Sequence, residues 1–470
     1  MLDKTISIHW FRRDLRIEDN PSLDYLNSLE EPIMCIYVLD EINNDDKIGQ
    51  ASKYFLNESL KSLNSILNNC LHLFKGCAFE ILESLLKDFK IKNISWNRCY
   101  EPWSIKRDKK IKSFLENEGI NVKSFNGSLL WEPWTVLKKD DTPYKVFSPY
   151  YKRGCLESAA PRYPIKSKKF NLLNISNDFE INKLKLLPKN NWYRKFEKIW
   201  KIDHYSLKNQ VADFFEKKIQ NYKLGRNFPA KHNVSRLSPY IHFGLVSPNM
   251  LWYECENLIQ NENVQHFKSE LGWREFSYYL LYHFPQITKK NLQVKFDKFP
   301  WKNKNDHLVK WQKGLTGYPI VDAGMRELWQ TGYMHNRVRM IVGSFLVKNL
   351  LIHWKEGEKW FWDCLLDADL ANNNVGWQWV AGTGADAAPY FRIFNPISQG
   401  EKFDTDGEYT KKYIPELKNL PSKYLFCPWA APEEVLKSNS IKLGLDYPYP
   451  IVDIKQSREL ALKCFSAIKS

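Results

Sequence analysis

The first third of the chain alternates short apolar runs with segments whose apolar residues recur at helical spacing. The apolar runs predict four buried strands, at residues 5–11, 32–39, 71–75 and 94–96. Between them, the spacing predicts helices over residues 51–68 and 79–89. Such alternation is typical of a doubly wound α/β domain, in which helices cover both faces of a parallel sheet.

The pattern changes in the second third of the chain. Between residues 144 and 199, prolines interrupt the periodicity and Lys and Asn dominate, which is typical of a long connector that is functional or links two domains. From about residue 207 onward, nearly every segment has helical spacing. The sequence therefore predicts an α/β domain over residues 1–135, a linker over 136–200 and a larger all-helical domain over 201–470.

Charge and aromatic content add two hints about ligands. The 69 basic against 54 acidic residues give a net charge of +15, which suggests a polyanionic partner, although a lysine-rich solvated surface has the same effect. Ten of the 18 Trp residues fall between Trp252 and Trp379. Indoles stack on flat ligands and also fill helical cores, so composition leaves both interpretations open.

Cysteine usage and the ends of the chain bear on its compartment. Nine cysteines are scattered singly with no CxxC pair, which argues against a disulfide framework and against a zinc site. The opening residues, MLDKT, do not form a signal peptide, and no apolar run approaches the roughly 18 residues of a membrane span. We expect a cytoplasmic protein with no metal site and no membrane contact.

The loop after the first predicted strand, residues 12–21, is expected to line a crevice at the carboxyl ends of the strands. It contains no GxGxxG, so the usual dinucleotide fingerprint is absent. A phosphate-binding P-loop and a Ser–His–Asp order are absent as well, and nothing supports a kinase or hydrolase.

Two clusters in the helical half could bind a ligand. Ser235 and Ser238 flank Arg236 just before a predicted helix, where hydroxyl and N–H groups could hold phosphate. The simpler interpretation is a helix cap, with Ser238 at the N-cap and a proline at the first helical position. Glu270, Trp273 and a neighbouring arginine share one helical face and could grip a planar polar ring, or form an ordinary amphipathic helix with an ion pair.

Two further clusters lie nearer the C-terminus. Asn336 and Met340 share a helical face with Arg339 beside them, and the adjacent His335 is expected to be a core residue. Asp367, two positions before Asp369, could bind Mg²⁺ with it or accept hydrogen bonds from a heterocycle, with Arg339 as a candidate partner. Together the four clusters suit a flat, polar-edged, phosphate-bearing ligand such as FAD.

Longer motifs carry a resemblance to a known family. The stretches HWFRRDLR at residues 9–16, TGYPIVDAGMR at 316–326 and the run 377–403 are the most specific. With them, the chain resembles the photolyase/cryptochrome family over almost its whole length, and most closely the cyclobutane pyrimidine dimer photolyases. The resemblance implies an α/β antenna domain joined by a long loop to an all-α FAD-binding domain, which agrees with the organisation predicted above.

The resemblance implies a set of FAD contacts. They are Tyr222, Ser235, Arg236, Leu237, Ser238, Asn336, Arg339, Asp367, Asp369 and Asn373. Within the Asn run 372–374, spacing favours Asn373 as the neighbour of the reactive flavin nitrogen. Val234 departs from the family, which usually has Thr there, so one hydroxyl contact to phosphate is expected to be missing.

Photolyases flip their target out of the DNA duplex. The resemblance therefore also implies a substrate site that holds a flipped-out dimer. Trp273 and Trp379 would form two walls of the pocket. Glu270, protonated in a dry pocket, would donate to a thymine carbonyl and stabilise the radical anion. Asn336, Arg337 and Met340 would line the rest. The backbone or pocket edge would be held by Arg226, Arg274, Arg337, Arg392 and Gln399.

The activity implied is light-driven splitting of the cyclobutane dimer by one electron from excited, reduced FAD, with the electron returned. Trp377, Trp354 and Trp301 match the family's electron-transfer chain, although core packing is the simpler interpretation of Trp301 and Trp354 without the resemblance. Residues 97–103 would border a second pocket for an antenna, methenyltetrahydrofolate, with 8-hydroxy-5-deazaflavin or no antenna as alternatives.

Three other functions remain as alternatives. The (6-4) photolyases carry histidines at the positions of Asn336 and Met340, and their absence favours the cyclobutane dimer. A cryptochrome-type blue-light photoreceptor often has a long C-terminal extension, whereas this sequence ends at Ser470, which favours repair. A light-independent nucleic-acid binder would be colourless. We expect a monomer that binds damaged DNA.

Overall fold

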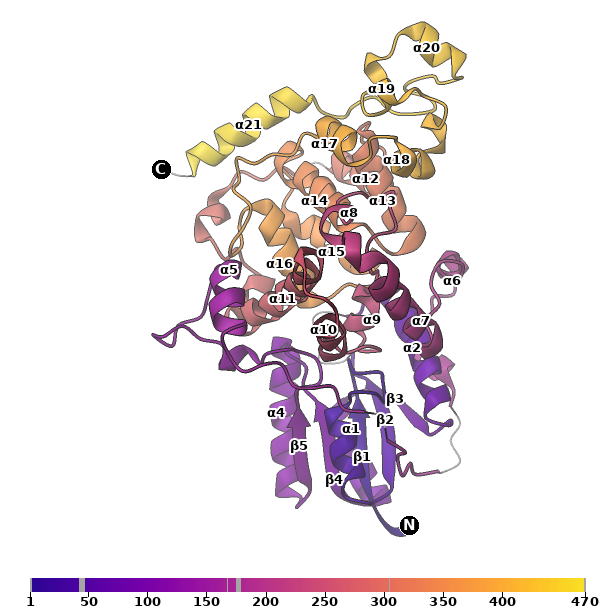
Figure 1. Ribbon diagram of the computed structural model, residues 1–470, viewed down its shortest axis with the longest axis vertical. Coiled ribbons are helices and arrows are strands. Elements are labelled where there is room, and N and C mark those ends of the chain that lie inside the picture. Colours follow the sequence, from indigo (N-terminus) through magenta and orange to yellow (C-terminus); the bar gives the residue numbers. More distant parts are fainter. Residues whose placement is uncertain (1, 42–46, 167, 175–178, 304, 469–470) are drawn as a thin grey trace. The chain divides into compact units, whose positions relative to one another are not determined.

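The computed structural model describes residues 2–41, 47–166, 168–174, 179–303 and 305–468. The chain forms two compact units. Unit 1 comprises Met1–Glu216 and Ser235–Pro285, and unit 2 comprises Lys217–Val234 and Gln286–Ser470. Figure 1 colours the elements of both units along the sequence.

The sheet of unit 1 confirms the predicted α/β fold class. Its five strands are all parallel, in the order β3-β2-β1-β4-β5. Their bounds are β1 Leu2–Phe11, β2 Ile33–Leu39, β3 Leu71–Lys75, β4 Phe89–Asn97 and β5 Asn121–Phe125. The four predicted strands are present, and β5 was not predicted because Val122 is its one fully buried residue, so an edge strand leaves little apolar signal.

The two faces of β1 differ in chemistry. Ile8 and Trp10 point into an apolar cluster with residues from helix α3, Ala78–Asp88, and helix α4, Pro102–Asn117. The alternate residue His9 points to helix α1, Pro21–Asn27, where its Nδ1 lies 2.9 Å from the hydroxyl of Ser22. Alternating side chains along β1 thus place apolar Ile8 and Trp10 on one face and polar His9 on the other.

Unit 1 continues with mostly short helices. After α2, Gln50–Ile66, the predicted linker contains α5, Phe147–Pro149, a π-helix at Tyr150–Cys155, and α6, Arg194–Glu197. The remaining α-helices in the described part of unit 1 are α7 His204–Asp213, α9 Ser238–His242, α10 Pro248–Glu256 and α11 Glu262–His283. Asn261 caps α11 by accepting hydrogen bonds from the N–H groups of Asn263 and Val264.

Unit 2 is helical in its described part, as predicted. Its helices include α8 Tyr222–Gly225, α12 Asn305–Lys313, α13 Pro319–Thr331, α14 Asn336–Ser344, α15 Trp354–Cys364, α16 Leu370–Ala381, α17 Pro396–Phe403, α18 Glu408–Tyr413, α19 Ser422–Leu425, α20 Glu433–Ser438 and α21 Ile454–Ala467. A continuous apolar core contains the indoles of Trp311, Trp354 and Trp377.

The TGYP motif has a structural role in unit 2. Asp322, fully buried on α13, accepts hydrogen bonds from the N–H and hydroxyl of Thr316, both at 2.7 Å, and from Gly317 N–H at 3.0 Å. The hydroxyl of Tyr447 donates to the same carboxyl at 2.5 Å. One carboxyl thereby ties the turn before α13 to the C-terminal segment.

Candidate functional site

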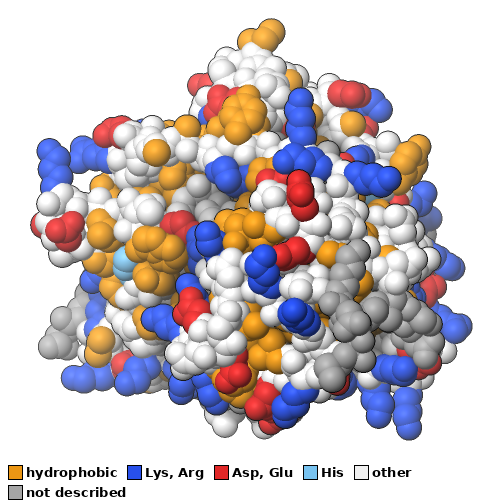
Figure 2. All heavy atoms as spheres, turned by 90° about the horizontal axis from the view of Figure 1, so that it is seen from below, with side chains coloured by type: hydrophobic (Ala, Val, Ile, Leu, Met, Phe, Trp, Pro, Cys, Tyr) orange, Lys and Arg blue, Asp and Glu red, His pale blue; other side chains and the backbone are white. Residues whose placement is uncertain are grey.

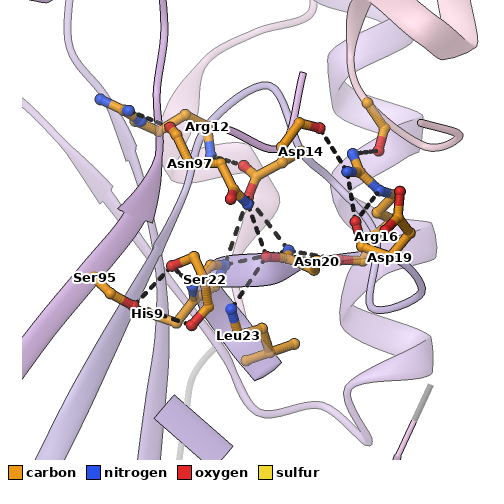
Figure 3. A network of polar contacts seen from close by, with 12 residues as sticks. His9, Arg12, Asp14, Arg16, Asp19, Asn20, Ser22, Leu23, Ser95 and Asn97 are labelled. Atoms are coloured by element: carbon orange, nitrogen blue, oxygen red, sulfur yellow. Dashed lines mark hydrogen bonds and ion pairs between the residues drawn. The ribbon is translucent and has the colours of Figure 1, made fainter. Parts of the chain in front are cut away.

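The carboxyl ends of β1 and β4 form the topological switch point of the sheet, where doubly wound folds bind ligands. Figure 3 shows that polar side chains meet there. Asn97, at the end of β4, donates to Asp14 at 2.6 Å and to Asn20 at 2.7 Å. The guanidinium of Arg12 donates to Asp108 and to the carbonyl of Asn97. These side chains are therefore engaged with one another.

Asp14 is the anionic centre of this network. Burial alone would raise its pKa, but hydrogen bonds from His9, Arg12 N–H and Asn97, with the charge of His9, lower the pKa to about 2. Arg16, 1% exposed, donates to the carbonyls of Asp19, Gly127 and Gly244. These hydrogen bonds tie the loop that was expected to line a crevice to the segments around Gly127 and Gly244.

The predicted antenna segment, residues 97–103, also has paired side chains. Arg98 and the hydroxyl of Tyr100 both donate to Glu132. Glu101 lies 2.7 Å from Arg13, and the Arg107 guanidinium lies 4.9 Å from the ring of Trp103. The segment therefore presents a folded polar and aromatic surface, and the antenna remains a prediction.

Helix α11 presents the predicted substrate side chains of unit 1. Trp273 is half-buried, and the ring of Phe147 stacks on it with centroids 3.7 Å apart and planes 11° apart. Behind Phe147, the ring of Tyr151 continues the stack at 5.4 Å and 9°. A Cβ on Gly272 would lie 2.6 Å from the Tyr151 ring, so this glycine allows the close approach.

The two charged neighbours of Trp273 have different partners. The Glu270 carboxylate lies 3.8 Å from His266, and its side chain is 27% exposed. Arg274 pairs with Glu275 at 2.9 Å, and the N–H of Leu130, also in unit 1, donates to the same carboxyl at 2.8 Å. Burial raises the pKa of Glu275 to about 7, against the opposing effect of Arg274.

The loop of Ser235 and Ser238 in unit 1 is anchored by hydrogen bonds to its backbone. Arg236 has a left-handed φ of 55°, and the carbonyls of Ser235 and Arg236 accept hydrogen bonds from Gln210 at 2.8 and 3.3 Å. The predicted cap was wrong by one position: α9 begins at Ser238, Leu237 is the N-cap residue, and its side chain cannot accept a hydrogen bond. Ser238 is exposed.

In unit 2, an arginine cluster surrounds the start of α14. Arg337 donates to Asn227 at 2.5 Å and lies 4.3 Å from the ring of Phe403. His335 is buried, and its Nδ1 accepts from Arg337 N–H at 3.2 Å, which confirms the expectation of a core residue. Burial, with the charges of Arg226, Arg337 and Arg339, lowers the pKa of His335 to about 3. The imidazole is therefore neutral.

The predicted ion pair between Arg339 and Asp367 is confirmed. The guanidinium donates to both carboxylate oxygens, at 2.9 and 3.1 Å, and to the carbonyl of Met334 at 2.7 Å. Although burial opposes it, the Asp367 charge raises the pKa of Arg339. The pair is 26% and 5% exposed, so the acidic partner is nearly dry.

The predicted acidic and amide residues Asp369, Asn373 and their neighbours lie at the start of α16. Asp369 caps the helix by accepting from the N–H and side-chain amide of Asn372, both at 2.8 Å. Asn373 is half-buried and donates to the carbonyl of Glu358 at 3.1 Å. Asn374 is fully buried and donates to the Glu358 carboxylate at 3.0 Å. Of these two amides, Asn373 is the more accessible.

The three tryptophans of the predicted electron-transfer chain lie in one core. Trp354 and Trp377 are buried and Trp301 is half-buried. A Cβ on Gly357 would lie 2.1 Å from the Trp377 ring, so only glycine fits beneath it. The imidazole of His353 lies between the other two rings, 5.0 Å from Trp301 and 5.4 Å from Trp354.

The remaining predicted residues of unit 2 lie on α14, on α16 and in the segment before α17. Asn336 is exposed at the first position of α14, and Met340 follows one turn later. Trp379 is half-buried on α16. Arg392 is exposed, while its carbonyl accepts from the buried Lys348 at 3.0 Å. Gln399 lies on α17.

Sequence reasoning missed several contributors. Phe147 and Tyr151 lie in the region read as a linker, although their aromatic spacing of four residues was a helical signal. Asn291 and Lys348 had no distinguishing pattern, because their roles depend on contacts distant in sequence.

Surface charge and possible metal or membrane features add little. On the face in Figure 2, Lys and Arg side chains are spread among Asp and Glu. No three His, Cys, Asp or Glu side chains in the described ranges gather as metal ligands would. Within the same ranges, every helix is too short or too polar to cross a bilayer.

Comparisons with known proteins agree with this arrangement. Residues 7–167 match the family described as DNA photolyase, and residues 267–467 match the FAD binding domain of DNA photolyase. The chain is 43% identical to a deoxyribodipyrimidine photo-lyase of Agrobacterium fabrum, over 98% of both chains. It is 35% identical to cryptochrome-2 of Arabidopsis thaliana, over 98% of this chain and 78% of that protein.

Solved structures show the same relationship. A bacterial class III photolyase from Agrobacterium tumefaciens has a TM-score of 0.95 and 42% identity, covering 100% of this chain and 98% of the other. An archaeal photolyase from Sulfolobus tokodaii, solved with two FAD molecules, has a TM-score of 0.82 and 29% identity, covering 98% and 99%. The chain belongs to the DNA photolyase family, which includes the cryptochromes.

Proposed function

We propose that this protein is a light-dependent DNA repair enzyme, a deoxyribodipyrimidine photo-lyase that splits cyclobutane pyrimidine dimers. The observation that carries the proposal is the end-to-end match to a protein of that name, 43% identical over 98% of both chains. Asn336 and Met340, one turn apart on α14, agree with it, since (6-4) photolyases are expected to have histidines there.

FAD is the cofactor that this family binds, and the donor set of the chain suits it. The Arg339–Asp367 pair and the capped Asp369 offer charged and polar edges to a heterocycle. The hydrogen-bonded loop at Ser235–Ser238 offers hydroxyl and N–H groups to phosphate, as expected for a nucleotide. Tyr222, Leu237, Asn336 and Asn373 complete the proposed set. When bound, FAD supplies the light absorption and the single electron of the repair.

The chain's own residues hold and polarise the dimer in this proposal. Trp273 and Trp379 provide flat apolar walls, and the O–H of protonated Glu270 donates a hydrogen bond to a thymine carbonyl. Asn336 and Met340 line the pocket. The flanking strand is held by arginines and one glutamine, as charge-assisted contacts to phosphate, at Arg226, Arg274, Arg337, Arg392 and Gln399.

Electrons for reducing the cofactor pass along Trp301, Trp354 and Trp377. The buried core positions of Trp354 and Trp377 and the half-buried position of Trp301 suit a path that begins near solvent. Indoles suit one-electron oxidation because their large π-systems spread the charge.

The proposal includes an antenna chromophore. This antenna is methenyltetrahydrofolate, with 8-hydroxy-5-deazaflavin as the alternative; a near-ultraviolet band beyond that of flavin in the purified protein would identify it.

The proposal also includes the compartment and the oligomeric state. The protein acts as a cytoplasmic monomer on damaged DNA. The nine cysteines, none of them in a disulfide, fit a reducing compartment.

The test uses purified, chemically reduced protein and an oligonucleotide with one cyclobutane dimer. Blue light should restore the intact thymines, and the dark control should not. Glu270→Ala should lower the repair yield while FAD stays bound, since Glu270 is placed on the substrate and not on the cofactor. Failure to repair this dimer, with signalling-type photochemistry retained, would instead favour a cryptochrome-type photoreceptor, to which the chain is 35% identical.

A further inference from the structure

Trp354, the middle tryptophan of the proposed electron-transfer chain, has a hydrogen-bonded indole. Trp354 is 0% exposed, and its Nε1–H donates to Asn291 Oδ1 at 2.8 Å. Asn291 is itself buried, at 8% exposure, and its Nδ2 donates to Asp297 Oδ1 at 2.7 Å. An exposed carboxylate is thereby connected through one amide to a fully buried indole.

The outer tryptophan lacks this arrangement. Among the described residues, the Nε1 of Trp301 is buried without a hydrogen-bond partner, although the ring as a whole is partly exposed. The edge of the Trp301 ring meets His353, which also contacts Trp354. Burial lowers the pKa of His353 to about 4, so this imidazole adds no positive charge between the two indoles at neutral pH.

Burial makes a positive charge on Trp354 costly. An ion moved out of water loses its solvation and needs a replacement from fixed dipoles or charges. A hydrogen-bond acceptor on the indole N–H favours the oxidised ring, because that N–H becomes a stronger donor when the ring is positive. The Asp297 carboxylate polarises the Asn291 amide so that negative charge increases at the Oδ1 facing Trp354.

We propose that Asn291, held by Asp297, is the positioning and tuning residue that lets the buried Trp354 carry the electron hole. The inference rests on the proposed electron-transfer chain. With FAD bound, each photoreduction step would take one electron from Trp377; Trp354 would replace that electron, and Trp301 would replace the one lost by Trp354. An added thiol would restore Trp301 by giving up one electron and one proton and becoming a thiyl radical. Without the acceptor, the hole stays on Trp377 and recombines.

The test is flash photolysis of the oxidised holoenzyme, with transient absorption of the long-lived tryptophan radical as the readout. Asn291→Leu should lower the radical yield about fivefold, the factor expected for one lost hydrogen bond. Asp297→Asn keeps the amide in place and should give a smaller loss. Asn349→Leu is the control, since Asn349 is buried and donates to Ser457 instead.

Further measurements distinguish an effect on electron transfer from a folding defect, and test the proposed electron-transfer chain itself. Flavin content, near-ultraviolet circular dichroism and dimer repair by pre-reduced protein should stay unchanged in Asp297→Asn, whose exposed side chain can be altered without disturbing the core. Trp354→Phe should abolish the radical; if it does not, the proposed chain is wrong. A normal radical yield in both Asn291→Leu and Asp297→Asn, with Trp354→Phe inactive, would overturn the inference alone.

Discussion

The indole of Trp273 and the phenyl ring of Phe147 lie almost parallel, with centroids 3.7 Å apart. One residue comes from the long helix α11 and the other from a short helical turn in the connector. Because Tyr151 stacks behind Phe147, the connector determines the plane of the indole that we assign to the dimer pocket. A segment without regular periodicity therefore contributes to the proposed site.

Removing this stack should weaken dimer binding. In Phe147→Ala, Trp273 loses an aromatic contact worth about 1 kcal/mol, so affinity for dimer-containing DNA should fall about fivefold. Phe147→Tyr, which keeps the ring, serves as the control. Competition binding with damaged and undamaged oligonucleotides measures the effect. An equal loss of affinity for both DNAs would show that Phe147 does not act through the pocket.

The Arg339–Asp367 pair should control cofactor retention. Asp367→Asn leaves a partly buried guanidinium without its counter-charge, at a cost of about 1–3 kcal/mol after allowing for solvent. FAD affinity should fall about 10- to 100-fold, as measured by the flavin absorbance that remains after dialysis. Glu356→Gln, at a side chain of α15 that is 43% exposed, is a charge-matched control that should retain FAD. Full retention in Asp367→Asn would remove this residue from the cofactor site.

Glu275 should make stability depend on pH. Its pKa is raised to about 7 by burial, so between its ordinary value near 4.5 and 7 the folded protein binds more protons than the unfolded chain. Stability linked to this group is therefore greatest at low pH and falls as pH rises to 7, by about 1–3 kcal/mol. Glu275→Gln should flatten this slope in urea unfolding at pH 5 and pH 8. An unchanged slope would contradict the prediction.

Two helical glycines should respond in opposite directions to alanine. In Gly357→Ala, the new methyl would overlap Trp377, and the free energy of unfolding should fall by about 1–3 kcal/mol. In Gly376→Ala, nothing lies within 4 Å, and helix propensity should raise stability by about 0.5–1 kcal/mol. Thermal unfolding compares them, and photoreduction should drop only in Gly357→Ala. Similar shifts in both variants would show that Trp377 can move aside.

Sequence patterns were sufficient to predict the features that depend on the local order of residue types along the chain. Apolar runs located β1 to β4, and opposite charges suggested the Arg339–Asp367 pair, which the structure confirms. They were insufficient where a long-range contact decides the outcome. Asn291 reaches Trp354 across 63 positions and had no local signature. The four-residue spacing of Phe147 and Tyr151 indicated a helical turn, but nothing in the local sequence indicated the contact between Phe147 and Trp273.

The interleaved course of the chain has a consequence for synthesis. Unit 1 is completed only by residues 235–285, although its sheet ends at Phe125 and Lys217–Val234 belongs to unit 2. On the ribosome, the sheet emerges long before residues 235–285, whose helices complete its unit. Unit 1 therefore stays incomplete while residues 217–234, which belong to unit 2, are synthesised. Splitting the gene after Glu216 would therefore divide unit 1 between two polypeptides, and neither fragment would contain a complete unit 1 core.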